Sequence, residues 1–584
     1  MKELQYLNKY FIKYRFRIIL GILITVGSKI FALFTPQLIG KSITLISDQI
    51  LNPGSTKVFR NELSLNILYI FGAAIATGLF TFLMRQTIIN VSRYVEFDLK
   101  NEIYKHYQQL SIAFYKRNRT GDLMSRISED VSKVRMYIGP ALMYTINTLT
   151  LFVVALFYMY NQSPALTLYT ILPLPLLSIS IYFLSKYIHK QSTIVQSHLS
   201  TLSSSTQEFF SGIWITKAYA LESQTEKTFS ELSNSQRKKR LGLSKIQALF
   251  FPLMLLLIGA SNLLVIYIGG KQYMNGQIEE IGIIAEFIIY VNMLTWPVAS
   301  IGWVTSLVQE AEASQKRINE FLKETPSIIN PTEKKTPIDG SIVFKEVYFT
   351  YEDTNIEALK GVSFEVEKGK TLAIIGNTGS GKSTILELIG RLYDVQKGSI
   401  EIDGVNIKTL NLNSLRTGIG FVPQDPFLFS DSLKNNIKFG KNKATDTEVI
   451  EASKKAVVHE NIINFKNGYD TILGERGITL SGGQKQRVSI ARAFIKSPQI
   501  LLLDDCLSAV DTETEEQILN NIKLVTKNKT TIIVSHRISS AKNADTIIVL
   551  NDGVISQQGT HNMLITVEGY YKELYQKQLR ETSN

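Results

Sequence analysis

Nine residues near position 380 have the types and spacing of a phosphate-binding loop. A strand-like apolar run, Thr371 to Ile375, precedes them, and a helical pattern follows. In such a loop, glycines let backbone N–H groups surround phosphates, a lysine reaches the β- and γ-phosphates, and a hydroxyl binds Mg²⁺. The sequence therefore predicts a nucleoside triphosphate site with Mg²⁺, in which Lys382 is the lysine, Ser383 is the hydroxyl, and the loop is Gly376, Asn377, Thr378, Gly379, Ser380, Gly381, Lys382, Ser383 and Thr384.

A second apolar run ends in two acidic residues. Ile500 to Leu503 are followed by Asp504 and Asp505. A buried strand of this kind delivers a carboxylate beside the Mg²⁺ of a bound nucleotide. We therefore expect Asp504 to share the metal site with Ser383, although apolar runs that end in Asp are common and the assignment depends on the loop.

Between these two elements lies Leu480-Ser481-Gly482-Gly483-Gln484, which matches the signature of ATP-binding-cassette (ABC) proteins. Further family motifs occur in the expected order, so the whole second half resembles an ABC nucleotide-binding domain. The resemblance implies that Tyr351 stacks on adenine and that His536 senses the γ-phosphate of ATP. It also implies that Gln424 contributes to the Mg²⁺ site and links the nucleotide to the membrane domain.

The signature also implies a dimer. Ser481, Gly482, Gly483 and Gln484 begin a helix, and Ser481 with the adjacent amides could bind phosphate only across a dimer interface. One chain therefore cannot make a complete hydrolysis site. By the same resemblance, Thr471 to Gly477 contacts intracellular loops, and Ser508 to Asp511 runs across the dimer interface.

One position departs from the family pattern. The residue after the strand carboxylate is usually Glu, which orients or activates the attacking water, but here it is Asp505. Asp is one methylene shorter, and a misplaced base loses rate. We expect this site to bind ATP and hydrolyse it slowly, as in the degenerate member of heterodimeric bacterial multidrug exporters. A homodimer that works with Asp505 is the alternative, favoured by the retained Gln424 and His536.

The first half of the chain has the pattern of a membrane domain. A length of 584 residues is too great for one hydrophobic core, so at least two domains are expected. Six apolar runs are each near the length of about 20 residues that a spanning helix needs. They are Ile18–Ile39, Leu65–Ile88, Met136–Tyr160, Leu166–Tyr187, Ala248–Ile268 and Ile281–Leu307.

The connections between the runs predict an orientation. Those after the second and fourth runs are about 50–60 residues long, helical in pattern and rich in Lys and Arg. The bias of positive residues places them in the cytoplasm, together with the N-terminus and the ATPase domain. The same bias accounts for the net charge of +12, so we expect no nucleic acid partner. The resemblance to bacterial exporters implies that the membrane is the inner membrane of a bacterial cell.

These patterns predict the fold class: an all-α six-helix exporter domain in the membrane, followed by an α/β P-loop nucleotide-binding domain. The expected bounds are 1–310 for the membrane domain, 311–339 for a linker and 340–584 for the cassette. The membrane half resembles six-helix exporter domains. By that resemblance, Phe114 to Asp122 and Glu208 to Tyr219 are the two regions that couple it to the cassettes.

The predicted function is ATP-driven export or flipping of amphipathic small molecules or lipids by a half-transporter, with ATP and Mg²⁺ as cofactors and the lipid bilayer and a second half-transporter as partners. Lys29 and Glu286 lie within apolar runs and are hypothesised to line the cavity. The alternatives are a peptide exporter, a soluble ATPase of the same family, which the apolar runs disfavour, and a ligand-gated channel or regulatory membrane subunit that uses the cassettes only to bind ATP.

Overall fold

The computed structural model describes residues 2–51, 54–474, 477, 480–507 and 512–583. The chain forms two compact units. The helical unit contains Met1–His106 and Gly121–Glu324, and the sheet unit contains Tyr107–Thr120 and Thr325–Asn584. A short segment of the first half of the chain thus belongs to the sheet unit.

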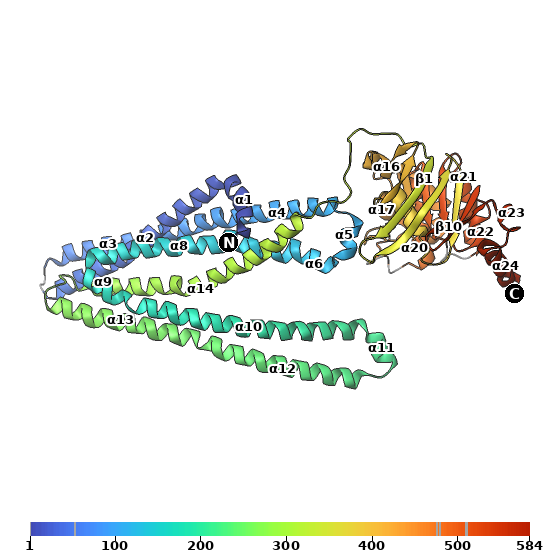
Figure 1. Ribbon diagram of the computed structural model, residues 1–584. Coiled ribbons are helices and arrows are strands. Elements are labelled where there is room, and N and C mark those ends of the chain that lie inside the picture. The colour runs from blue at the N-terminus through green and yellow to red at the C-terminus, as the bar shows by residue number, and fades with distance from the viewer. Residues whose placement is uncertain (1, 52–53, 475–476, 478–479, 508–511, 584) are drawn as a thin grey trace. The chain divides into compact units, whose positions relative to one another are not determined.

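The helical unit is built from long helices joined by short turns (Figure 1). Its main helices are α2 (Arg15–Leu51), α3 (Thr56–Met84), α4 (Asn90–Gln109), α8 (Leu142–Gln162), α10 (Pro173–Ser211), α12 (Glu222–Ala248), α13 (Phe250–Met274) and α14 (Gly282–Leu322). Shorter helices are α1 (Asn8–Lys13), α6 (Thr120–Ser125), α7 (Val131–Met136), α9 (Pro164–Ile171) and α11 (Ile213–Ala218). A 3-10 turn, η1 (Glu3–Leu7), and three π-helical turns, η2 (Arg85–Ile89), η3 (Arg126–Asp130) and η4 (Tyr137–Ala141), complete it.

Among the described residues, five helical stretches are long and apolar enough to cross a membrane. They are Arg15–Leu51, Thr56–Gln109, Thr120–Gln162, Glu222–Met274 and Gly282–Leu322. Four of the predicted apolar runs fall within them, and a fifth, Ile281–Leu307, begins one residue before Gly282–Leu322. The remaining run, Leu166–Tyr187, is divided between α9 and α10. Pro173, at the start of α10, has no backbone N–H and therefore cannot continue the helical hydrogen bonds of α9.

The helices pack closely where α2 meets α14. A side chain at Gly282 would overlap the carbonyl oxygen of Gly40, and the Gly282 N–H donates to Thr44 Oγ1 at 3.2 Å. The fully buried side chains Phe287, Tyr290, Val291 and Leu294 of α14 lie in the core of the unit. By contrast, α3 and α13 expose many apolar side chains, as expected for helices covered by lipid.

The sheet unit contains two sheets. The first is antiparallel, in the order β2 (Ile356–Val366), β1 (Ile342–Tyr351), β4 (Lys397–Ile402) and β5 (Val405–Asn406). The second has the order β10 (Val554–Gly559), β9 (Thr546–Asn551), β3 (Thr371–Gly376), β8 (Thr530–Val534), β7 (Ile500–Asp504) and β6 (Ile419–Val422). All its pairs are parallel except that of β10 with β9. The carboxyl ends of β3, β6, β7 and β8 therefore meet at one edge.

Helices surround these sheets: α5 (Ile112–Arg117), α15 (Lys382–Ile389), α16 (Leu412–Gly418), α17 (Leu433–Lys438), α18 (Asp446–Lys455), α19 (His459–Ile463), α20 (Gly482–Ile495), α21 (Thr512–Val525), α22 (Ile538–Ala541), α23 (His561–Leu564) and α24 (Tyr570–Ser583), with a 3-10 turn, η5 (Gly468–Asp470). Alternate residues of β3 enter different cores: Leu372 and Ile374 belong to one cluster of buried side chains, and Ala373 and Ile375 belong to another. The central sheet is therefore buried on both faces.

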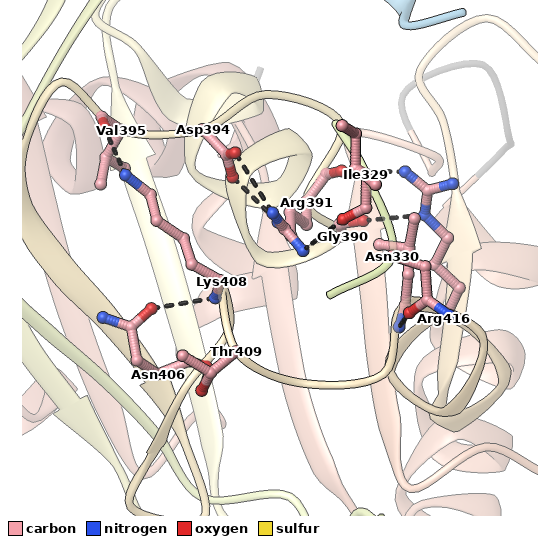
Figure 2. A network of polar contacts seen from close by, with 11 residues as sticks. Ile329, Asn330, Gly390, Arg391, Asp394, Val395, Asn406, Lys408, Thr409 and Arg416 are labelled. Carbon is pink, nitrogen blue, oxygen red and sulfur yellow. Dashed lines mark hydrogen bonds and ion pairs between the residues drawn. The ribbon is translucent and has the colours of Figure 1, made fainter. Parts of the chain in front are cut away.

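The segment before β1 is anchored to the sheet unit (Figure 2). Arg391 forms an ion pair with Asp394 and donates to the carbonyl oxygen of Ile329 at 3.4 Å. Asn330 Oδ1 accepts the N–H of Leu412 at 2.8 Å. Residues 325–339 contain no helix or strand, whereas 311–322 continue α14. The domain bounds 1–310, 311–339 and 340–584 stay a prediction.

Candidate functional site

The loop between β3 and α15 follows the carboxyl end of a central strand. Gly381 precedes α15 with φ of +97°, and a side chain there would overlap the carbonyl oxygen of Ala358. A side chain at Gly376 would overlap the carbonyl oxygen of Leu550 on β9. Glycine is therefore required at both ends of the loop, because the backbone lies directly against neighbouring strands.

Lys382 bends back over this loop. Its ammonium donates to the carbonyl oxygens of Gly376 at 2.9 Å and Asn377 at 2.7 Å, and the residue is 6% exposed. Burial lowers the pKa of Lys382, and the carboxylates of Asp505 and Asp504 oppose that shift. The Ser380 hydroxyl is buried and has no hydrogen-bond partner among the described residues. A buried hydroxyl and a partly desolvated ammonium fit the phosphates of ATP, which would supply acceptors for both.

The two predicted metal ligands contact each other. Ser383 Oγ donates to Asp504 Oδ1 at 3.0 Å. Burial raises the pKa of Asp504, and the hydrogen bond from Ser383 opposes this rise. A hydroxyl and a carboxylate beside a phosphate loop are oxygen ligands of the kind that Mg²⁺ uses together with substrate phosphates. Gln424 follows β6 with an exposed side chain, and its carbonyl oxygen accepts from Gln486 Nε2 at 3.4 Å.

Asp505 and His536 follow neighbouring strands. The Asp505 N–H donates to the Val534 carbonyl oxygen at 2.9 Å, and Asp505 has φ of +40°. Burial lowers the pKa of the half-buried His536; the charge of Lys382 also lowers it, and that of Asp505 opposes the shift. Gln578 of α24 donates to the His536 carbonyl oxygen at 2.8 Å and accepts the N–H of Ile538 at 2.8 Å. Sequence reasoning missed Gln578, because no motif surrounds it.

Tyr351 lies at the end of β1, next to α15. Its hydroxyl donates to Glu387 Oε2 at 2.9 Å and lies 3.0 Å from Thr384 Oγ1. Its ring meets those of Phe349 and Tyr393 edge to face, with centroids 4.9 and 5.5 Å away. The predicted adenine contact is thus joined to the helix that begins at the phosphate loop.

The signature begins α20. Ser481 Oγ accepts the Gln484 N–H at 3.3 Å, and Gln484 Oε1 accepts the Ser481 N–H at 3.0 Å, which forms a capping box. Ser481 and Gly482 are exposed, and Gly483 is half-buried. The predicted dimer-interface residues Ser508 to Asp511 lie outside the described residues, as do four positions within 475–479 that include part of the predicted loop-contact segment.

Comparisons with known proteins match both halves of the chain. The family model of the "ABC transporter transmembrane region" matches residues 18–298, and the model "ABC transporter" matches residues 359–508. The probable multidrug resistance ABC transporter ATP-binding/permease protein YheI of Bacillus subtilis is 35% identical over 98% of this chain and 97% of its own length. The multidrug resistance-like ATP-binding protein MdlA of Escherichia coli is 36% identical over 87% of this chain and 86% of its own.

A solved structure of a bacterial Atm1-family ABC exporter with ATP bound superposes with a TM-score of 0.80. It is 26% identical, and the match covers 97% of this chain and 99% of that one. The chain belongs to the ABC exporters. The predicted fold class and the predicted ATP hydrolase activity coupled to transport are thereby confirmed. The exporter spans the bacterial membrane several times and acts as a dimer that binds ATP.

The first predicted coupling region of the exporter begins in the sheet unit. Within this unit, Ile112 and Ala113 of α5 pack against the core around β1 and α15. The ammonium of Lys116 lies 4.8 Å from the ring centroid of Tyr351 and 5.1 Å from that of Tyr393. Lys116 lies in the predicted coupling region from Phe114 to Asp122, but its place beside Tyr351 was not predicted.

The second predicted coupling region contains α11, which joins the long neighbouring helices α10 and α12 (Figure 1). Three aromatic side chains there are strongly exposed: Trp214 at 79%, Tyr219 at 74% and Phe210 at 71%. Large exposed aromatic side chains at a helical turn make this segment a candidate surface for contact with another protein segment or a membrane.

The helical unit also contains a cavity of about 550 Å³ between α8, α10 and α14. Its described lining is apolar and hydroxyl-bearing, with no ionisable group except the phenol of Tyr144: Tyr144, Thr145, Thr148, Leu149, Phe152, Leu156, Ile171, Pro175, Val298, Ser300, Ile301, Val304 and Thr305. Neither Lys29 nor Glu286 is among these residues. Glu286 is instead 3% exposed and accepts a hydrogen bond from Tyr290 Oη at 2.8 Å.

Proposed function

We propose that this ABC exporter moves amphipathic small molecules or lipids across the inner membrane as one half of a heterodimer, in which its own ATP site hydrolyses slowly. The observation that carries the proposal is Asp505, at the position where the family has Glu. The backbone N–H of Asp505 is hydrogen-bonded to Val534 on β8. A small shift of the strand therefore cannot compensate for the shorter reach of the Asp side chain. A base displaced by about 1 Å loses rate by roughly 10²-fold.

The proposed roles of the site residues follow from the resemblance of their motifs to those of the family. ATP phosphates are held by the loop from Gly376 to Thr384, with Lys382 as the cation, and adenine stacks on Tyr351. Mg²⁺ is bound by Ser383, Asp504 and Gln424. His536 contacts the γ-phosphate. The exposed segment from Ser481 to Gln484 completes the ATP site of the partner, because a capped helix N-terminus binds anions through its free N–H groups.

The substrate class is inferred from the cavity in the helical unit. Its described lining offers aromatic and aliphatic surface together with threonine, serine and tyrosine hydroxyl groups. Such a surface suits uncharged or weakly charged amphipathic molecules, since a buried ion would find no partner there. The names of YheI and MdlA refer to multidrug resistance, which agrees with this class. The basic loops favour an orientation with the ATPase domain in the cytoplasm.

A homodimer that works with Asp505 is the second candidate. It is favoured by the presence of Gln424 and His536, the other two predicted catalytic residues. In a homodimer, every ATP site would contain both the phosphate loop and the signature of this chain. The two candidates therefore differ in what a single substitution in this chain does to the complex.

Two variants of this chain separate the candidates. The complex is purified from its native membrane through a tag on this chain and reconstituted in lipid nanodiscs, and phosphate release is measured at saturating ATP. In a heterodimer, Lys382→Ala disables only the slow site of this chain, so most of the ATP turnover of the complex remains. Ser481→Arg blocks the fast site of the partner, so most of the ATP turnover is lost. Equal loss in both variants would refute the heterodimer, and mass spectrometry of the complex identifies the second chain.

Transport is tested separately in proteoliposomes. We expect ATP-dependent accumulation of the dye Hoechst 33342 in vesicles whose ATPase domains face outward. Thr148→Val and Ser300→Ala, which remove hydroxyl groups from the cavity with little change in side-chain volume, are expected to change the KM for the dye. Dye transport that is unchanged in both variants would contradict the assignment of the cavity.

A further inference from the structure

The helix α5 places a cation against two aromatic rings of the sheet unit. Lys116 Nζ lies 4.8 Å from the centroid of Tyr351 and 5.1 Å from that of Tyr393. The two rings meet edge to face, with centroids 5.5 Å apart and planes at 88°. An ammonium within about 6 Å of a ring centroid is attracted by the negative face of the ring. Lys116 therefore attracts both rings at once.

The surroundings of Lys116 keep its ammonium charged. Burial by itself lowers the pKa of Lys116, but the hydrogen bond with Tyr393 and the negative charges of Glu387 and Asp353 outweigh it, and the pKa is raised. The side chain as a whole remains exposed to solvent. Its removal therefore leaves no cavity in a packed core, and the fold of the sheet unit does not depend on it.

Tyr351 carries this contact to the phosphate loop. Its hydroxyl is bonded to Glu387 and lies 3.0 Å from Thr384 Oγ1, and both residues are in α15, which begins at Lys382. Lys116, Tyr351 and Tyr393 also border one cavity of about 250 Å³, together with Ala113 of α5. One continuous set of contacts thus runs from α5 through a single ring to the helix of the phosphate loop.

We propose that Lys116 is a positioning residue that fixes the ring of Tyr351 for adenine and thereby couples the docking of α5 to the binding of ATP in the same chain. The inference rests on the proposed role of Tyr351 as the adenine contact. Coupling of this kind is reciprocal: if docked α5 favours ATP, bound ATP favours docked α5 by the same factor. Lys116 then determines the affinity for ATP and leaves the chemical step unchanged.

Affinity is measured on the intact exporter in lipid nanodiscs by photolabelling with 8-azido-ATP, since the labelled chains separate on a gel and each site is read by itself. Lys116→Met is expected to raise the half-saturating concentration for this chain by about 3- to 10-fold. Lys116→Arg keeps a cation over the rings, so its half-saturating concentration is expected to equal that of the wild type. Lys360→Met, the same change at an exposed lysine of β2, is the matched control and is expected to have no effect.

Reciprocity is measured by hydrogen exchange of the peptides that cover residues 107–120. ATP is expected to slow exchange of these amides in the wild type and in Lys116→Arg, and to have little effect in Lys116→Met. A structural role alone would instead lower thermal stability and maximal turnover together, without rescue by Arg. The inference would be overturned if Lys116→Met had the same half-saturating concentration as the wild type. It would also be overturned if ATP still slowed hydrogen exchange of residues 107–120 in Lys116→Met.

Tyr351→Ala separates failure of this inference from failure of the proposed function. If Tyr351→Ala leaves half-saturation unchanged, the adenine contact itself is wrong. If Tyr351→Ala weakens binding while Lys116→Met does not, only the role of Lys116 fails. When both are right, Lys116→Met has no additional effect in the Tyr351→Ala background, because both changes remove the same interaction.

Discussion

Lengthening one side chain tests whether geometry makes this site slow. Asp505 follows β7, and its N–H is bonded to the Val534 carbonyl oxygen at 2.9 Å, so its Cα has a defined place at the edge of the sheet. Asp505→Glu therefore moves the carboxylate outward without moving the strand. The residue has φ of +40°, a conformation that Asp tolerates better than Glu, so the change costs about 1 kcal/mol of stability or less.

The expected gain in rate follows from the added bond. One methylene extends the side chain by about 1.3 Å, and a displacement of about 1 Å of a catalytic group changes the rate by roughly 10²-fold. This corresponds to a barrier lower by about 2.7 kcal/mol at 25 °C. The stability cost is smaller than this gain and affects the amount of folded protein, not the turnover of each folded molecule.

The assay isolates this chain's own site. In the proposed heterodimer, Ser481→Arg blocks the partner's site, and phosphate release at saturating ATP then reports the site that contains Lys382 and Asp505. Adding Asp505→Glu in this background is expected to raise turnover by about 10²-fold. In the unblocked complex the same change is expected to raise turnover by at most about twofold, because the partner's site already works.

Asp505→Asn is the matched control, since it keeps the size of the side chain and removes its charge. It is expected to leave the blocked complex at its background rate. The geometric explanation is refuted if the Asp505→Glu variant of the blocked complex releases phosphate no faster than the Asp505→Asn variant. It is also refuted if the blocked complex with Asp505 unchanged already turns over within about threefold of the Asp505→Glu variant. A homodimer in which Asp505 supports efficient hydrolysis would already turn over nearly as fast as the Asp505→Glu variant.

Three further predictions concern other parts of the exporter. Gly282→Ala forces α2 and α14 apart at Gly40 and is expected to destabilise the helical unit by about 1–3 kcal/mol in thermal unfolding, whereas Gly270→Ala, which meets no atom within 4 Å, should not. Trp214→Ser removes the most exposed aromatic side chain of α11 and is expected to lower transport per ATP hydrolysed several-fold; an unchanged ratio would exclude a coupling role. Burial lowers the pKa of His536, so the folded state binds this proton less readily than the unfolded state, and stability is lost as the pH falls below about 6.5. His536→Gln is expected to reduce that loss in melting curves between pH 5 and 7.5, and identical pH dependence would contradict it.

Local sequence was sufficient to predict the strands, loop and helix that carry the candidate ATP site. The loop from Gly376 to Thr384 and the strand that ends in Asp504 are each continuous segments, so residue order alone specifies which side chains they carry. Their setting between strand and helix is also local. Apolar runs of sufficient length likewise predicted the membrane helices, because a helix in lipid must satisfy its backbone hydrogen bonds within itself. The division of the fourth run at Pro173 follows from a single residue.

Only the tertiary structure decided which distant groups support that site. Gln578 holds both sides of the His536 turn from a helix 42 residues away, and no spacing rule connects the two positions. Lys116 belongs to the first half of the chain, yet it lies against Tyr351 because α5 packs with the sheet unit. Short-range patterns record periodicity and covalent order, whereas contacts of this kind depend on how whole elements pack, and that packing is set by many side chains together.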